Sequence, residues 1–435
     1  MKATRCLFRN FWQGACCAGL VLAPWAQAGT AEIDFAGFAS FVYAKTVTDD
    51  DKKGEFSKIT NDGEYRDFNK LGLRMTADLK DNLTFTAQMV AEGSNDYNPE
   101  FDWIFATYQI TPGLALSAGK YRVPVFAYSD YLDTSYAYQW ILPPISIYNP
   151  YQTPFKSMEG VKITYLADLG RAWTSELLVW GGKADDEFSE TGVDSRLLLD
   201  DAYGIAWTVE REWLSLRAFY LGADTSVDVT TNATLNDLIY GSGAVFGGTS
   251  ATPGDPANLS ITNMELMLST AFGVPVNLRD DLLWEKDASR FYGGGAALDF
   301  EKWFVRSEFT RIEVENNIVV PQMDSFYVMA GVRLPASVTV SLTYGEDKDR
   351  TNREVYEQMD RYVALNPALA TYQGGLKTFA DFLQNYDIKA TTLSTRWDFS
   401  RSASLKFEYL VHEWSIDHAK SQSPQAVRVG LDLVF

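Results

Sequence analysis

The stretch Leu71–Ala91, LGLRMTADLKDNLTFTAQMVA, contains two runs of alternating residues joined by a short turn at 80–82. The apolar members of both runs fall on one face, and these are Leu71, Leu73, Met75, Ala77, Leu79, Leu83, Phe85, Ala87 and Met89. Polar residues such as Arg74 and Thr84 alternate with them. A period of two is the pattern of a β-strand with one apolar face. Runs of about nine to eleven such residues are long enough to cross a bilayer as tilted strands.

Similar runs recur along the chain, and from them we predict sixteen strands. Every second connection is short, at 80–82, 111–113, 168–171, 210–212, 299–302, 335–336 and 399–401. The connections between these are mostly long and polar, at 46–67, 92–102, 121–156, 182–201, 223–289 and 345–386, with helix-like spacing at 263–272 and 353–382. Short turns on one side and long loops on the other are typical of outer-membrane barrels. We therefore predict an all-β fold, a transmembrane antiparallel β-barrel of about 16 strands.

The first 28 residues have the composition of a secretory signal peptide. Basic residues precede a short apolar run, which ends at the small-x-small sequence Ala26–Gln27–Ala28. We predict cleavage after Ala28, with 29–435 forming the barrel domain. All three cysteines lie within the signal peptide, so we expect no disulfide and no thiolate metal site in the barrel.

The chain is acidic, with 57 acidic against 38 basic residues and a formal net charge of -19. This balance makes nucleic acid a poor partner, because phosphate binding requires basic side chains. The two histidines after the signal peptide, His412 and His418, have no nucleophile and orienting group in a catalytic pattern beside them. We therefore predict that the chain is not an enzyme and that it holds no cofactor and no metal.

The connection after the fifth strand, Tyr121–Lys156, is long, rich in proline and yet strongly aromatic. Proline removes a backbone donor and is excluded from helix interiors and central strands, so the segment is a loop. A long apolar loop within a compact fold is usually functional. We predict that it folds back into the barrel lumen and constricts a pore.

Selectivity in such a pore depends on the charges around its narrowest part. The predicted constriction comprises Asp130, Asp133, Glu159, Arg74, Lys120, Arg122 and Arg306. Carboxylates facing guanidinium groups would create a field across the lumen; alternatively, these pairs only anchor the loop to the wall. Lys120 and Arg122 share strand parity with Leu114 and Leu116, so both face lipid unless a bulge at Gly119 reverses the parity or they lie beyond the hydrocarbon layer.

The loop also offers aromatic rings for solute stacking, at Tyr128, Tyr131, Tyr138 and Trp140. Sugars or aromatic acids would stack on such rings. The alternative is that the rings pack against the barrel wall.

The last residues, Val427–Phe435, alternate and end in an aromatic ring. This ending resembles the C-terminal assembly signal of bacterial outer-membrane barrels, although Phe435 is alternatively an interfacial aromatic. The chain resembles the sixteen-stranded, usually trimeric porins of Gram-negative bacteria. The resemblance rests on this ending, on the layout of strands and loops, and on the segments Gly119–Pro124 and Trp140–Pro144.

The resemblance implies a location in the bacterial outer membrane and passive diffusion of small hydrophilic solutes and ions. It also implies a homotrimer, insertion by the barrel-assembly machinery, and contact with outer-membrane lipid and lipopolysaccharide. Two alternatives remain. One is a substrate-specific channel for an anion, a sugar or an aromatic acid, whose aromatic loop binds the solute. The other is a non-conducting barrel that serves as an adhesin or an enzyme.

Overall fold

The computed structural model describes residues 32–48, 59–149, 156–170, 172–188, 195–228, 236–237, 240–244, 248–255, 257–273, 285–315, 322–350, 386–416 and 423–435, with scattered positions between 357 and 373. The predicted signal peptide at 1–28 lies outside these residues, as does most of the predicted helix at 353–382. Within the described ranges the sixteen predicted strands are present.

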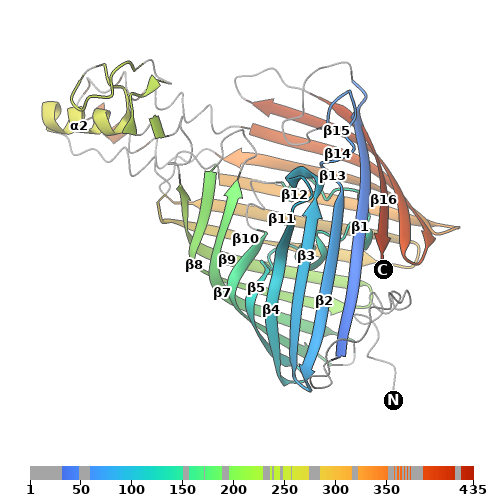
Figure 1. Cartoon of the computed structure of the whole chain (residues 1–435). Coiled ribbons are helices and arrows are strands. Elements are labelled where there is room, and N and C mark those ends of the chain that lie inside the picture. Colours follow the sequence, from blue (N-terminus) through green and yellow to red (C-terminus); the bar gives the residue numbers. More distant parts are fainter. Residues whose placement is uncertain are drawn as a thin grey trace.

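The strands form one closed antiparallel barrel in which each strand pairs with its neighbours in sequence (Figure 1). They are β1 (Glu32–Thr46), β2 (Lys70–Lys80), β3 (Leu83–Glu92), β4 (Pro99–Thr111), β5 (Leu114–Arg122), β6 (Ser157–Asp168), β7 (Thr174–Phe188), β8 (Ser195–Arg211), β9 (Leu214–Asp228), β10 (Asp287–Asp299), β11 (Trp303–Val314), β12 (Gln322–Leu334), β13 (Val338–Arg350), β14 (Tyr386–Ser400), β15 (Ala403–Ile416) and β16 (Gln425–Val434). The first strand closes the barrel by pairing with the last. Closure leaves no strand edge unpaired, as a membrane requires.

The seam between β1 and β16 is sealed by the chain terminus. The backbone N–H of Gly37 donates to the Phe435 carbonyl at 2.6 Å, and the Phe435 N–H donates to the Gly37 carbonyl at 3.0 Å. A Cβ at position 37 would lie only 2.3 Å from the Phe435 ring, so the ring lies directly over this glycine. Phe435 therefore packs on the first strand.

The outer face of the barrel is apolar and exposed. Its members include Leu71, Leu73, Val161, Ile163, Tyr165, Val179, Ile205, Leu216, Phe309, Val328, Leu342, Leu393 and Phe407. The alternate positions of the strands point inward and are largely polar. This apolar-out, polar-in alternation is the arrangement of a barrel that spans a membrane.

Several strands run further than the alternation predicts. β7 extends to Phe188 and β8 begins at Ser195, so both enter the predicted loop at 182–201. β13 extends to Arg350. These extensions carry charged side chains on the outer face, where Lys183 contacts Asp200 at 2.8 Å. The outward positions of a strand are no longer apolar once it leaves the membrane, so the period-two signal ends before the strand does.

The predicted helix at 263–272 is confirmed as α2 (Ile261–Phe272). Ser260 caps its start by accepting a hydrogen bond from the Asn263 backbone, and Gly273 ends it with φ 64°. It lies in the connection between β9 and β10, away from the ring of strands (Figure 1). Among the described helices, none is long and apolar enough to cross a membrane.

Candidate functional site

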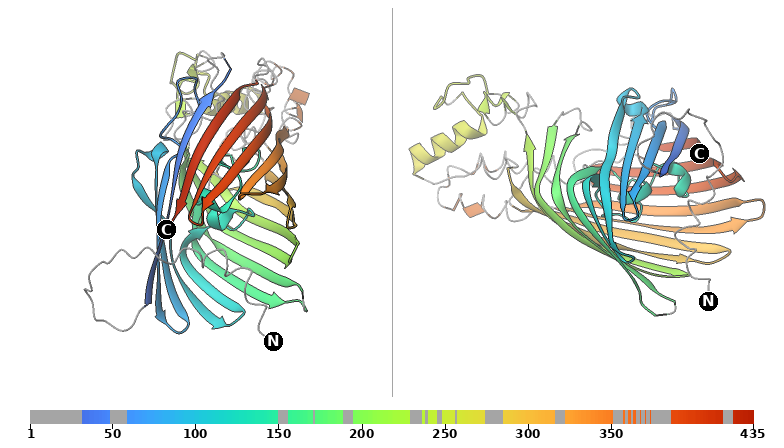
Figure 2. Two further views of the ribbon diagram at one scale, coloured as in Figure 1. Left: turned by 90° about the vertical axis from the view of Figure 1, so that its right-hand side faces the viewer. Right: turned by 60° about the horizontal axis from the view of Figure 1, so that its bottom comes forward.

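The connection between β5 and β6 lies inside the ring of strands (Figure 2). Its described part, 123–149, makes two short turns, η2 (Ser129–Tyr131) and η3 (Ser135–Ala137). Its buried apolar residues join wall residues in one cluster, and the loop members are Val123, Val125, Phe126, Tyr128, Tyr138, Trp140 and Ile147. Burial of these side chains supplies the hydrophobic free energy that holds the loop against the wall.

Glu308 on β11 anchors the loop to the inner wall of the barrel. One carboxylate oxygen accepts the backbone N–H of Ala127 at 3.0 Å. The other accepts the hydroxyls of Tyr148 at 2.7 Å and Tyr327 at 2.6 Å. Burial raises the pKa of Tyr148, so its phenol stays protonated and can donate. A buried carboxylate with three donors is well satisfied.

The loop is also anchored to β13, β14 and β15. The Trp140 indole N–H donates to the Thr343 hydroxyl at 2.8 Å. The Ile141 backbone N–H donates to Glu408 at 2.9 Å. Lys406 donates to the Trp140 carbonyl at 2.6 Å and contacts Asp432 at 2.9 Å. These strands and β11 belong to one continuous arc of the barrel, so the anchors fix the loop along that arc.

A cluster of buried charges holds the start of the loop. Arg122 contacts Asp133 and also Asp102, the latter at 3.1 Å. Lys70 on β2 lies 3.7 Å from Asp133 and 2.7 Å from Glu92. Burial favours the neutral form of Asp133, but Arg122 and Lys70 outweigh it and hold the pKa of Asp133 below its ordinary value. The predicted pair Asp133 and Arg122 is thus in direct contact.

Asp130 differs from Asp133 because its side chain is exposed, on the turn η2. Arg74 lies within electrostatic range of both aspartates, stacks over Trp103 at 4.1 Å and donates to Gln88. The loop therefore presents a free carboxylate toward the part of the wall that carries Arg74.

Three further charged residues of the wall belong to this region, and the predicted constriction does not include them. Glu176 on β7 lies within electrostatic range of Asp130, Arg217 and Lys162. Arg217 also donates to the Pro124 carbonyl of the loop at 2.6 Å. Lys162 alternates with the outward-facing Val161 and Ile163. Strand parity could have identified Lys162 as inward, but nothing in the sequence indicates which strands face Asp130.

Lys120 and Glu159 are not brought to the loop. They lie opposite each other on β5 and β6, and Ile104 of β4 lies opposite Lys120 on its other side. Ile104 is exposed, so this row faces outward. Gly119 has φ 133°, yet both pairings continue across it without a register shift, so parity is not reversed there.

The aromatic residues of the loop pack mainly on one another. Tyr128 makes edge contacts with Tyr131, Tyr138 and Trp140, with ring centroids 5.5 to 5.9 Å apart. Its hydroxyl accepts a hydrogen bond from Arg306 at 3.0 Å. Tyr131 is half-buried and the other three rings are buried. Solute stacking stays a prediction, and Tyr131 is the ring with most surface for it.

Comparisons of structure find several outer-membrane proteins that are similar to this chain over nearly its whole length. The outer-membrane channel DcaP of Acinetobacter baumannii is 13% identical with a TM-score of 0.54, covering 95% of this chain and 100% of that one. OmpT of Vibrio cholerae is 11% identical with a TM-score of 0.53, covering 94% and 99%. An anion-selective porin from Comamonas acidovorans is 12% identical with a TM-score of 0.50, covering 93% and 100%.

The chain has the fold of the outer-membrane porins. No protein-family model matches the sequence, and a search of curated protein sequences finds no match. At this level of identity the likeness concerns the fold alone. The porin fold combines here with an inward loop that is anchored by buried charges and presents Asp130.

Proposed function

We propose that the chain is a channel of the bacterial outer membrane, through which small hydrophilic solutes and ions diffuse passively. A closed barrel with an apolar outer face is suited to the membrane, and its polar inner positions are suited to water. The same fold occurs in a protein described as an outer-membrane channel and in another described as an anion-selective porin.

The observation that carries this proposal is the unequal burial of the inner wall. Inward-facing polar residues on β13 to β16 are buried beneath the loop, and they include Thr343, Ser394, Lys406, Glu408, Arg428 and Asp432. On the opposite wall Lys162 and Arg217 are only partly buried, and Asp130 faces that side exposed. Charged groups beside the loop therefore remain accessible within the lumen, and charges at the narrowest part of a pore are what set its selectivity.

The test is conductance of the purified chain in a planar bilayer under a salt gradient. A steady conductance with a defined reversal potential is expected, and steps grouped in threes would support a homotrimer. D130N should shift the selectivity toward anions and R74Q toward cations, because each removes one charge beside the pathway. The selectivity ratio should change by about twofold or more.

K120Q is the matched control for R74Q, since it also removes a cation from a strand but on the outer face. It should leave the reversal potential unchanged. A barrel that folds but passes no current would refute the channel and favour an adhesin or an enzyme. A larger shift for K120Q than for R74Q would refute the proposed pathway.

A further inference from the structure

The outer face of β11 to β13 carries a cluster of basic side chains at the end of its apolar layer. Arg311 on β11, Asp324 on β12 and Lys348 on β13 lie opposite one another in a single row across the three strands. Arg350 follows Lys348 on the same face of β13, since alternate residues of a strand share a face. Phe309 shares a face with Arg311 in the same way and is exposed on the outside of the barrel. The cluster therefore faces away from the lumen.

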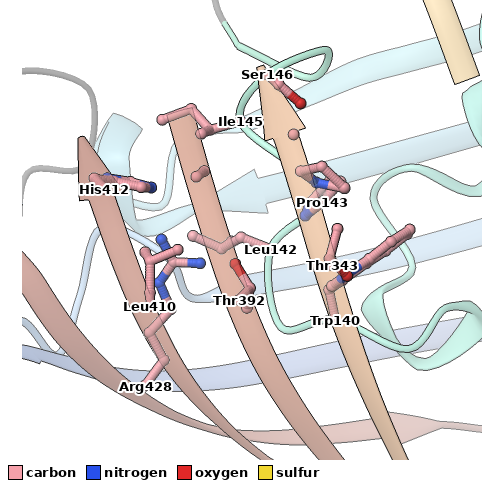
Figure 3. A pocket seen from close by; sticks show the side chains of 13 residues that line it. Trp140, Leu142, Pro143, Ile145, Ser146, Thr343, Thr392, Leu410, His412 and Arg428 are labelled. Carbon is pink, nitrogen blue, oxygen red and sulfur yellow. The ribbon is translucent and has the colours of Figure 1, made fainter. Parts of the chain in front are cut away.

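The inner face of β13 is already occupied. Figure 3 shows Trp140 of the loop beside Thr343, to which its indole N–H donates. Asp347, which alternates with Lys348, is fully buried and accepts hydrogen bonds from Asn149 and Ser325. Lys348 and Arg350, on the opposite face, are exposed. A ligand can therefore reach these basic residues only from outside the barrel.

Asp324 holds two arginines close together. Its carboxylate accepts hydrogen bonds from Arg311, from Nε at 2.5 Å and from Nη2 at 2.9 Å. The Nε of Arg350 lies 2.5 Å from the oxygen that accepts from Nη2. Within the described residues Arg350 makes its contact through Nε, so both of its Nη groups remain as donors. A guanidinium edge can bind two oxygens of a phosphate by parallel hydrogen bonds.

The other carboxylates near the cluster have partners of their own. Glu313 accepts the hydroxyl of Tyr292 at 2.9 Å. Lys389 on β14 lies 3.5 Å from Asp387 and opposite Glu346. The three cations of the cluster thus share one carboxylate, which leaves an excess of positive charge. The chain as a whole has a formal net charge of -19 and repels anions, so a local excess of cations is informative.

The cluster lies at the depth of the lipid headgroups. Phe309 and Phe326 are the next outward residues toward the bilayer after Arg311 and Asp324, and the Phe326 ring lies 6.1 Å from that of Tyr344. Aromatic side chains gather where the hydrocarbon meets the headgroups. β13 leads at this end into the long connection before β14, and long connections lie on the outside in outer-membrane barrels. The headgroups beside the cluster are therefore those of the outer leaflet.

We propose that Arg311, Lys348 and Arg350 bind a phosphate group of lipopolysaccharide. This lipid of the outer leaflet carries phosphate monoesters on its lipid A anchor, next to the acyl chains. The phosphate accepts hydrogen bonds from the Nη groups of Arg350 and from the ammonium of Lys348, while an acyl chain packs against Phe309 and Phe326. Asp324 positions the two arginines. The site lies outside the lumen, so it goes beyond the proposed channel.

The test is native mass spectrometry of the full chain in detergent and EDTA. Diphosphoryl lipid A is the probe, and phosphatidylglycerol, which carries a single phosphodiester, is the comparison. One lipid A per chain should bind at micromolar concentration, and phosphatidylglycerol about tenfold more weakly. Equal binding of the two lipids would overturn the assignment to lipopolysaccharide. Binding of lipid A only after Mg²⁺ is added would also overturn it, because the metal would then bridge carboxylates to the phosphate.

Three variants test the geometry. K348Q/R350Q removes two of the three cations and should weaken lipid A binding about tenfold or more. R350K keeps the charge but loses the guanidinium edge, so it should weaken binding less. R196Q is the matched control, because Arg196 is 52% exposed against 50% for Arg350 and also pairs with an aspartate, Asp185. It should bind as the wild type does. An equal loss in R196Q would show a general attraction to exposed cations and refute the site.

Circular dichroism and the heat-dependent mobility of the barrel on gels establish that each variant is folded. Unchanged affinity in folded K348Q/R350Q would place the lipid elsewhere and refute the site. Both positions face away from the lumen, so this double variant should keep the wild-type conductance. Binding of lipid A by a barrel that passes no current would leave the site and refute the channel, and conductance without lipid A binding would do the reverse.

Discussion

Asp133 shows at the residue scale how a buried charge can fix a loop. Its carboxylate contacts Arg122 and lies 3.7 Å from Lys70, while only a small part of the residue is exposed. Burying an isolated carboxylate is costly, so this position is stable only because two cations accompany it. Removing the charge would leave both cations with fewer partners.

The lowered pKa of Asp133 predicts a dependence of stability on pH. A group whose pKa is lower in the folded state stabilises the fold above its unfolded pKa, and that contribution is lost as the pH falls through the folded value. The stability advantage of the wild type over D133N should therefore be present at about pH 5. It should shrink below about pH 4, where an unfolded aspartate becomes protonated.

Thermal unfolding of both proteins in detergent at a series of pH values measures this difference. D130N is the control, because Asp130 is exposed to solvent, which screens the interactions of its charge. It should alter the Tm less than D133N does at neutral pH. A difference between wild type and D133N that grows as the pH falls would contradict the stabilising role of the ionised carboxylate.

At the scale of the element, the strands were predictable because membrane-facing residues repeat with a period of two. The ends of β7 and β8 were not, since the charged Lys183 and Asp200 occupy outward positions where alternation expects apolar side chains. The sequence did not decide whether Lys120 points inward or outward, because a bulge at Gly119 could have reversed the alternation. The pairing of β5 with β4 and β6 shows no such bulge. Alternation therefore identifies strands well but does not locate their outer ends.

The contact between Gly37 and Phe435 closes the barrel and offers a test on one element. G37V places side-chain atoms where the Phe435 ring lies, with the first of them 2.3 Å from it. Overpacking of this kind costs about 1–3 kcal/mol, so the Tm in detergent should fall by several degrees.

A87V is the control, because Ala87 faces outward on β3 and the added methyl groups meet lipid or detergent. It should leave the Tm nearly unchanged. If F435A lowers the Tm as G37V does, and the double variant adds little, the two residues act as one contact. Full additivity would show that they act separately.

For the whole molecule, the sequence could predict that a loop enters the lumen but not which wall it covers. Charged inward positions occur on many strands, and only the three-dimensional packing buries Glu308 and Glu408 beneath the loop while leaving Lys162 accessible. The pairing of Asp133 with Arg122 joins residues close in sequence, whereas Glu176 and Asp130 meet from separate elements. Such distant juxtapositions have no local signal.

Replacing residues 126–146 by a glycine-serine segment of equal length tests the loop within the whole barrel. Such a segment lacks the apolar side chains that hold the loop against the wall, so it should leave the lumen wider. The single-channel conductance should rise about twofold or more. The same replacement at 249–255, in the connection that carries α2, is the control and should leave the conductance unchanged. An unchanged conductance in the first variant would show that the loop does not limit the pore.

The anchoring of the loop also sets an order of assembly. Synthesis produces the loop long before the strands that hold it, since Ala127 precedes Glu308 by 181 positions and Ile141 precedes Glu408 by 267. These two anchors of the loop are therefore absent until the last third of the chain has been made. Contacts so distant in sequence form late, because chain closure over such lengths must come first. Pairing of the first strand with the last and packing of the loop against its anchors are thus the final steps in the folding of this barrel.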